Sequence, residues 1–185
     1  MGCINDGFKM MVPAITILVL AWSISGVCRD LLSTGEYIGH IVETSNFPLM
    51  LLPLVIFLVA AFLSFAMGTA WGTFGILIPI VVAVFEGTDP TMMIISISAC
   101  MAGAVCGDHC SPISDTTIMA SAGGQCNHVN HVSTQLPYAI TVAAISFVTY
   151  IVAGFTKSAW ISLPVGAALT VGVLVLLGKM KKKEQ

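Results

Sequence analysis

The sequence predicts an all-helical protein that crosses a membrane several times, and three observations support this prediction. The 185 residues are 57% hydrophobic and only 9% charged, with a mean hydropathy of +0.97. A soluble domain carries roughly 25% charged residues, so this chain has too few to cover a water-facing surface. The apolar residues also come in runs that approach or exceed the roughly 20 residues needed to span a bilayer. Finally, two of these runs are interrupted by short polar segments.

The first predicted span covers residues 10–28. Pro13 falls in its first turn, where proline is tolerated because the missing N–H has no helical partner there. The segment that follows carries Arg29, Glu36 and other polar residues, so we expect it at the interface or in water.

Residues 47–86 form an apolar block that is too long for one span. The block is interrupted at 67–73 by the sequence MGTAWGT. The arm after the interruption, 74–85, has 12 residues. It would reach about 18 Å as a helix, against a hydrocarbon core of about 30 Å. We therefore predict a re-entrant helical hairpin, which enters and leaves the membrane on one side, with its tip at 67–73.

Residues 90–122 predict a discontinuous transmembrane helix. Asp89 followed by Pro90 is a strong helix start, because aspartate caps a helix and proline suits its first position. The helix then meets the polar segment 107–117, GDHCSPISDTT. Proline removes a backbone donor and disfavours the helical conformation of the residue before it, so Pro112 predicts unwinding there.

Two ordinary spans are predicted at 136–155 and 159–178, and a basic tail follows at 179–185. Lys and Arg are enriched in cytoplasmic segments, so this tail predicts a cytoplasmic C-terminus. Each predicted membrane crossing, counted back from the C-terminus, changes the side of the membrane. This count places the polar loop at 123–135 in the cytoplasm and the opening of the hairpin outside. We expect a multi-pass protein of the plasma (inner) membrane, in contact with lipid. No basic patch suggests a nucleic-acid partner.

The two polar segments are the candidate functional sites. Backbone groups inside a bilayer must be paired, so irregular segments at membrane depth occur only within protein or beside a water-filled cavity. Asp108 and Asp115 lie in the second segment without a Lys or Arg near them in the sequence. An ionisable group at membrane depth marks a functional site by default.

These residue types suggest ion exchange. A carboxylate withdrawn from water tends to keep a proton, and Na⁺ is a hard cation that prefers oxygen ligands. H⁺ and Na⁺ would compete at such a site, and alternate exposure to the two sides would exchange them. Either aspartate could carry the proton. The candidate oxygen ligands are Asp108, Asp115, Ser111, Ser114, Thr116 and Thr117.

Each segment also has a simpler interpretation. Gly68 and Gly72 form a GxxxG pattern, which often serves only helix packing. Asp108 and Asp115 could lie in an interfacial loop with both carboxylates in water.

The cysteines and histidines raise further alternatives. Cys106, His109, Cys110 and Cys126 carry side chains that bind zinc, but their spacing matches no standard pattern, so we predict no metal centre. His128 and His131 have helical spacing and could sense pH, although ordinary solvated histidines are the simpler interpretation. No nucleophile–base pair is suggested, so we predict no enzyme and no cofactor beyond the transported ions.

At the two polar segments the sequence resembles the NhaC-type Na⁺/H⁺ antiporter family. The resemblance is carried by GDHCSPISDTT at 107–117 and by GTAWGT at 68–73 with FGILIP at 74–79. Shorter stretches also fit: PAI at 13–15 leading to LAW at 20–22, TGEY at 34–37, and TQLPY at 134–138. Together they cover roughly residues 7–155.

The resemblance implies an architecture of two inverted repeats, each with a re-entrant hairpin and an unwound helix. By position, the hairpin tip would be Gly68, Thr69, Ala70, Gly72 and Thr73. The unwound site would be Asp108, Ser111, Pro112, Ser114, Asp115 and Thr116, with the helix break marked by Gly107 and Pro112.

The resemblance predicts Na⁺/H⁺ antiport across the plasma membrane. Members of the family are more than twice as long, so we expect this chain to correspond to a C-terminal half. Its partner would be the missing N-terminal half or a second copy of itself. One alternative is a Na⁺/H⁺-coupled exchanger of organic anions or amino acids, such as malate and lactate. Another is a membrane subunit that transports nothing.

Overall fold

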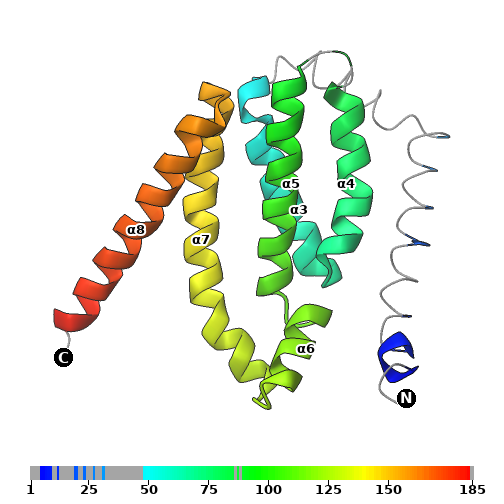
Figure 1. Ribbon diagram of the computed structural model, residues 1–185, viewed down its shortest axis with the longest axis vertical. Coiled ribbons are helices and arrows are strands. Elements are labelled where there is room, and N and C mark those ends of the chain that lie inside the picture. Colours follow the sequence, from blue (N-terminus) through cyan, green and yellow to red (C-terminus); the bar gives the residue numbers. More distant parts are fainter. Residues whose placement is uncertain are drawn as a thin grey trace.

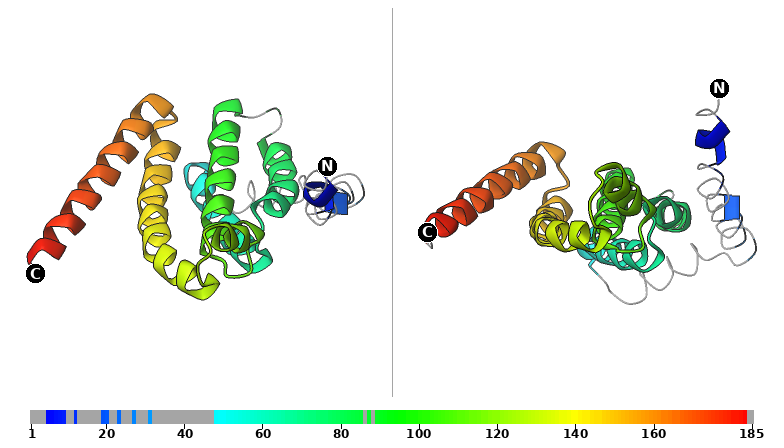
Figure 2. Two further views of the ribbon diagram at one scale, coloured as in Figure 1. Left: turned by 60° about the horizontal axis from the view of Figure 1, so that its bottom comes forward. Right: turned by 90° about the horizontal axis from the view of Figure 1, so that it is seen from below.

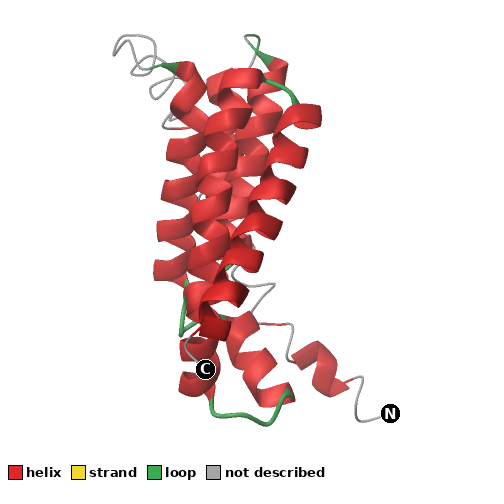
Figure 3. Cartoon of the chain, turned by 90° about the vertical axis from the view of Figure 1, so that its left-hand side faces the viewer, coloured by secondary structure: helices red, strands yellow, loops and turns green. Residues whose placement is uncertain are grey.

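The computed structural model describes residues 5–9, 12, 19–20, 23, 27, 31, 48–85, 87 and 89–183. Across these described residues the secondary structure is helical and contains no strand (Figure 1, Figure 3). Among the residues that the structure describes, four helical segments are long and apolar enough to cross a membrane: Leu49–Met67, Pro90–Cys110, His128–Thr156 and Ala159–Lys179. These segments confirm the prediction of an all-helical membrane protein. The span predicted at 10–28 lies almost entirely outside the described residues.

A helical hairpin occupies the first apolar block. Its arms are α3, Leu52–Met67, preceded by the short 3-10 helix η2, Leu49–Leu51, and α4, Ala70–Phe85. Gly68 ends α3 with a φ of 67°, and its N–H donates to the carbonyl oxygen of Ser64. Glycine suits this left-handed conformation because it carries no Cβ. The turn is shorter than the predicted tip, because the residues from Ala70 onwards are already helical.

Helix α5, Pro90–Cys110, runs beside α3 in the same direction (Figure 1). Glycine allows the two backbones to approach closely. A Cβ placed on Gly103 would overlap the carbonyl oxygen of Phe57, and one on Gly107 would overlap that of Ala61. The buried apolar residues of α3, α4 and α5 form two clusters: Leu52, Val81, Phe85 and Met92, and Ala60, Ala70, Cys100 and Ala104.

Asp89 caps α5 as predicted, since its side chain accepts hydrogen bonds from the N–H groups of Thr91 and Met92. The helix continues through Cys110, and α6 begins at Asp115. The non-helical residues 111–114 are called the break. This break is narrower than the predicted unwound segment 107–117. Ser111, which precedes Pro112, is extended with φ −82° and ψ 126°, as expected for a residue before proline.

The remaining helices are α6, Asp115–Gly123, α7, His128–Thr156, and α8, Ala159–Lys183. Figure 2 shows α6 lying across the lower end of the bundle and α8 leaning away from it. Part of the predicted loop at 123–135 is helical, because Asn127 caps α7 by accepting from Asn130 N–H. The predicted tail at 179–185 likewise continues α8 as far as Lys183. Pro137 lies inside α7, whose lower part bends towards α6 (Figure 1).

Candidate functional site

Asp108 is the carboxylate around which the candidate site is built. It lies in the last turn of α5 and is only 3% exposed. Its Oδ1 accepts a hydrogen bond from Ser114 Oγ at 2.8 Å, and its Oδ2 accepts one from Thr116 Oγ1 at 2.6 Å. Ser114 is the last residue of the break and Thr116 lies in the first turn of α6. The break therefore turns the chain back, so that the start of α6 faces the end of α5.

The three side chains form a closed ring of four oxygen atoms, called here the Asp108 ring. Ser114 Oγ and Thr116 Oγ1 are themselves 2.7 Å apart. The ring thus contains three short oxygen–oxygen contacts, and each needs one hydrogen atom. The two hydroxyl groups supply two of them. A proton on the Asp108 carboxyl would complete the ring, and an ionised Asp108 leaves the two hydroxyl oxygens facing each other.

Two other predicted ligands, Ser111 in the break and Thr117 in α6, support the ring without belonging to it. Ser111 is buried, and its Oγ donates to the carbonyl oxygen of Phe65 on α3 at 2.8 Å. Thr117 is also buried, and its N–H donates to Ser114 Oγ at 3.3 Å. Ser111 therefore fastens the break to α3, while Thr117 helps to orient Ser114.

Asp115 has different surroundings from Asp108. It is the first residue of α6 and is partly exposed, and its Oδ1 accepts a hydrogen bond from Thr116 N–H at 2.8 Å. Within the described part of the chain, no hydrogen bond joins the two carboxylates. The structure thus places one predicted carboxylate inside the ring and the other at its edge.

The hairpin tip lies directly against the break. A Cβ on Gly68 would be 2.7 Å from the carbonyl oxygen of Ile113, so the two backbones are in contact. The predicted tip residues Thr69, Ala70, Gly72 and Thr73 are all buried. The Thr73 hydroxyl donates to the carbonyl oxygen of Thr69 at 3.0 Å, within the same helix end. The tip thus approaches the site through its backbone, whereas the Thr73 hydroxyl is used within the hairpin.

His128 is a contact residue that the sequence did not reveal. Its Nε2 lies 2.6 Å from the carbonyl oxygen of Pro112, and its Nδ1 lies 3.1 Å from Ser121 Oγ. The first residue of α7 therefore joins the break to α6. The sequence favours an ordinary solvated histidine at this position and leaves a pH sensor as the alternative. The distance between His128 and Pro112 along the chain gives no signal of their contact.

A groove of about 880 Å³ separates α5 from α7. Its lining is mostly apolar, with polar groups that include His109, Gln135 and Tyr138. Cys106 and His109, two of the four side chains with zinc-binding chemistry, line this groove.

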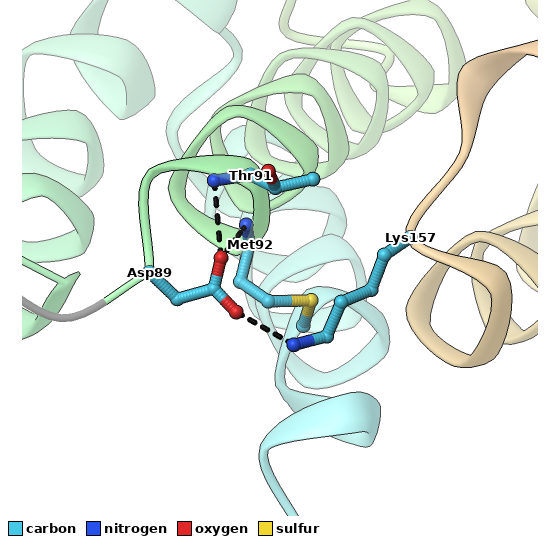
Figure 4. Close-up of polar contacts among 4 residues, drawn as sticks. All are labelled: Asp89, Thr91, Met92 and Lys157. Atoms are coloured by element: carbon cyan, nitrogen blue, oxygen red, sulfur yellow. Dashed lines mark hydrogen bonds and ion pairs between the residues drawn. The ribbon is translucent and has the colours of Figure 1, made fainter.

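At the opposite end of the bundle from the break, a charged pair joins α5 to α7. Lys157, just past the end of α7, donates from Nζ to Asp89 Oδ2 at 2.6 Å (Figure 4). This hydrogen bond, together with those from the backbone N–H groups of Met92 and Thr91, lowers the pKa of Asp89 below its ordinary value. The start of α5 is therefore both capped and tied to the turn between α7 and α8.

Relatives of known sequence extend over most of the chain. An uncharacterised protein of Haemophilus influenzae is 47% identical over 96% of this chain and 33% of its own length. The malate-2H⁺/Na⁺-lactate antiporter of Bacillus subtilis is 28% identical over 82% of this chain and 31% of its own length. An uncharacterised Na⁺/H⁺ antiporter of Haemophilus influenzae is 30% identical over 83% of this chain and 32% of its own length.

The chain thus spans about a third of the length of these curated relatives, which is less than the half expected above. No solved structure matches it at a comparable level. The sequence pattern of the Na⁺/H⁺ antiporter family matches residues 1–155, which include the hairpin, the break and nearly all of α7. The family membership and the four apolar helical segments indicate a multi-pass membrane protein. The match also confirms the predicted resemblance: the chain belongs to the Na⁺/H⁺ antiporter family.

Proposed function

We propose that this chain contributes the ion-exchange site of a Na⁺/H⁺ antiporter in the plasma membrane, and that H⁺ and Na⁺ compete for Asp108. The observation that carries the proposal is the Asp108 ring, a buried carboxylate whose two oxygens are each bonded to a hydroxyl group. The ring is one hydrogen short when Asp108 is ionised. A single positive charge, either a proton or a sodium ion, makes up this deficit.

The competition follows from charge and geometry. An ionised carboxylate is costly to bury without a partner of opposite charge. When the proton leaves, Na⁺ takes over its role, and the Ser114 and Thr116 hydroxyls turn their lone pairs towards the ion. Because both ions neutralise the same charge, binding of one excludes the other. Asp115, at the edge of the ring, attracts cations to the site.

The hairpin and the break would lie at membrane depth in this proposal. Helix α4 has 16 residues, about 24 Å at 1.5 Å per residue, which is short of a hydrocarbon core of about 30 Å. A re-entrant hairpin that opens outside, followed by a discontinuous helix and a cytoplasmic C-terminus, accommodates this length. The remaining two thirds of the transporter would come from the rest of a longer protein or from further copies of this chain.

The test is Na⁺ binding by the chain in lipid nanodiscs, measured by calorimetry between about pH 6 and 9. Competition for one carboxylate predicts that the apparent Kd for Na⁺ rises about tenfold per unit fall in pH, wherever Asp108 is protonated. The variant Asp108→Asn should bind no Na⁺, and Asp115→Asn should bind it more weakly with the same pH dependence. Binding of Na⁺ by Asp108→Asn would overturn the proposal. Absence of binding by the native chain, alone and within its complex, would favour the non-transporting subunit.

A second candidate is Na⁺/H⁺-coupled exchange of a small organic anion or amino acid. It is favoured by the relative named as a malate/lactate antiporter and by an arginine/ornithine antiporter of Halobacterium salinarum, which is 35% identical over 56% of this chain. The groove between α5 and α7 has the volume of a small-molecule site. If malate, lactate, arginine or ornithine is required for Na⁺ flux in vesicles containing the complete transporter, this candidate replaces simple Na⁺/H⁺ antiport.

A further inference from the structure

Ser64 on α3 carries a buried hydroxyl group without a partner. Its side chain is fully buried, and its Oγ makes no hydrogen bond within the part of the chain that the structure describes. Other helical hydroxyl groups here donate to the carbonyl oxygen four residues earlier, as those of Ser133 and Ser162 do. Ser64 does not use that local acceptor. A buried hydroxyl without a partner is costly, which makes Ser64 Oγ a candidate ligand atom.

The packing of α3 against α5 brings Ser64 to the carboxylate of Asp108. Ala60 on α3 and Ala104 on α5 belong to one buried cluster, and a Cβ on Gly103 would be 3.1 Å from the Cβ of Ala60. The two helices run in the same direction (Figure 1), so the side chains one turn further along each helix face each other again. One turn beyond Ala60 is Ser64, and one turn beyond Ala104 is Asp108. Both are buried.

Contacts on both sides of this position fix the register of the two helices. A Cβ on Gly107 would overlap the carbonyl oxygen of Ala61, and Ser111 Oγ donates to the carbonyl oxygen of Phe65. These contacts bracket Ser64 on α3 and the carboxylate of the ring on α5. No hydrogen bond joins the Ser64 hydroxyl to that carboxylate. An ion between two oxygens holds them further apart than a shared hydrogen does, so this arrangement suits a cation.

We propose that Ser64 Oγ is a further ligand of the sodium ion that binds Asp108. The Asp108 ring offers a carboxylate and two hydroxyl groups from the break and α6. A hard cation is held by several oxygen atoms, and Ser64 adds a hydroxyl oxygen from a different helix. Helix α3 then contributes a side chain to the ion site, in addition to the backbone contact at the tip. This inference rests on the proposed function of Asp108.

Helix packing is the simpler reason for a serine at this position. Ala60, Ser64 and Gly68 are small residues spaced four apart, a pattern that lets helices approach closely. Packing requires a small side chain but no hydroxyl group, so alanine would serve it equally well. The two interpretations therefore differ in what they predict for Ser64→Ala. Packing predicts native Na⁺ binding, whereas an ion ligand predicts weaker binding by a chain that remains stable.

The experiment is calorimetry of Na⁺ binding by the full chain in lipid nanodiscs, with unfolding in detergent measured alongside. Ser64→Ala removes one ligand oxygen, so Na⁺ affinity should fall about tenfold. Ser64→Cys offers a soft sulfur atom, which suits Na⁺ poorly, and should lose affinity similarly. Both variants should keep the pH dependence of the native chain, because Asp108 still carries the proton. Ser64→Ala should be at least as stable as the native chain, because it removes an unpartnered hydroxyl.

Ser96→Ala is the matched control. Ser96 Oγ on α5 is also buried without a partner among the described residues, but Ser96 precedes Asp108 by 12 residues, about 18 Å along the helix. This variant should therefore bind Na⁺ with native affinity. Native affinity in Ser64→Ala, or equal losses in Ser64→Ala and Ser96→Ala, would overturn the inference. If Asp108→Asn then still abolished binding, the proposed function would stand. Absence of Na⁺ binding by the native chain would remove both.

Discussion

The hairpin tip and the break are both short interruptions of apolar helices, but the structure equips them differently. The tip is a turn closed by backbone, with Gly68 in the left-handed region and the Thr73 hydroxyl bonded to the carbonyl oxygen of Thr69. The break brings a buried carboxylate and two hydroxyl groups into one ring. In the proposed mechanism the tip therefore provides shape and close approach, whereas the break provides the ion-binding groups.

The largest expected effect is the loss of Na⁺-driven proton movement when the charge near the break is removed and the tip is left unchanged. Asp108→Asn keeps the size of the side chain but removes its negative charge, so Na⁺-driven proton movement by the complete transporter should fall by about a hundredfold or more. Thr69→Val at the tip should change it much less. The measurement is pH-sensitive fluorescence in inverted membrane vesicles after a Na⁺ pulse. Equal losses in the two variants would contradict the distinction between tip and break.

A glycine substitution tests the shape of the tip. Gly68→Ala must adopt a left-handed conformation and also brings a Cβ to within 2.7 Å of Ile113 O. We expect it to lower the free energy of unfolding by about 1–3 kcal/mol. Gly172→Ala on α8, where a Cβ would meet nothing within 4 Å, is the control and should not destabilise the chain. Unfolding in detergent measures both, and a fully stable Gly68→Ala would show that the tip tolerates a side chain.

Single hydroxyl groups sharpen the comparison further. Thr116→Val removes a ring hydroxyl that donates to Asp108, and we expect Na⁺ affinity to fall about tenfold. Thr73→Val removes a hydroxyl that serves only its own helix end, so its effect on affinity should be below about threefold. The Na⁺ affinities of both variants are measured by calorimetry in nanodiscs. A larger loss from Thr73→Val would place the tip hydroxyl in the ion site.

The smallest effect concerns the far end of α5. Because Lys157 and the backbone N–H groups lower the pKa of Asp89, its contribution to stability is present at neutral pH. It is lost as the pH falls through the lowered pKa, that is, below the ordinary value of 3.8. At pH 7, Asp89→Asn should therefore unfold at a lower temperature than the native chain. The difference between the two unfolding temperatures should be smaller at about pH 3. Asp6→Asn, in the described N-terminal segment, serves as the control.

Local rules were sufficient where local chemistry decides the structure. The cap at Asp89 and the interruption around Pro112 depend on a few neighbouring residues, and both could be predicted. The helical state of residues 107–110 could not be predicted. Proline acts mainly on the residue before it, so the N–H groups of earlier residues keep their helical hydrogen bonds. The hydrogen-bond partners of Asp108 depend on how the chain reverses direction at the break. Residue spacing in the sequence does not predict that reversal. The contact of His128 with Pro112 joins residues from separate helices and was missed for the same reason.

The contacts between α5 and α7 are distributed unevenly along their length. Near the start of α5 the helices are joined by the Asp89–Lys157 pair and by the Tyr150 hydroxyl, which donates to Ser98 O. The groove runs between them from Ile94 to His109 on α5. At its other end α7 meets the chain of α5 again, because His128 contacts the carbonyl oxygen of Pro112 in the break. The two rods are thus fastened at both ends with a groove between them, so at least one fastening must give way before one helix can tilt relative to the other.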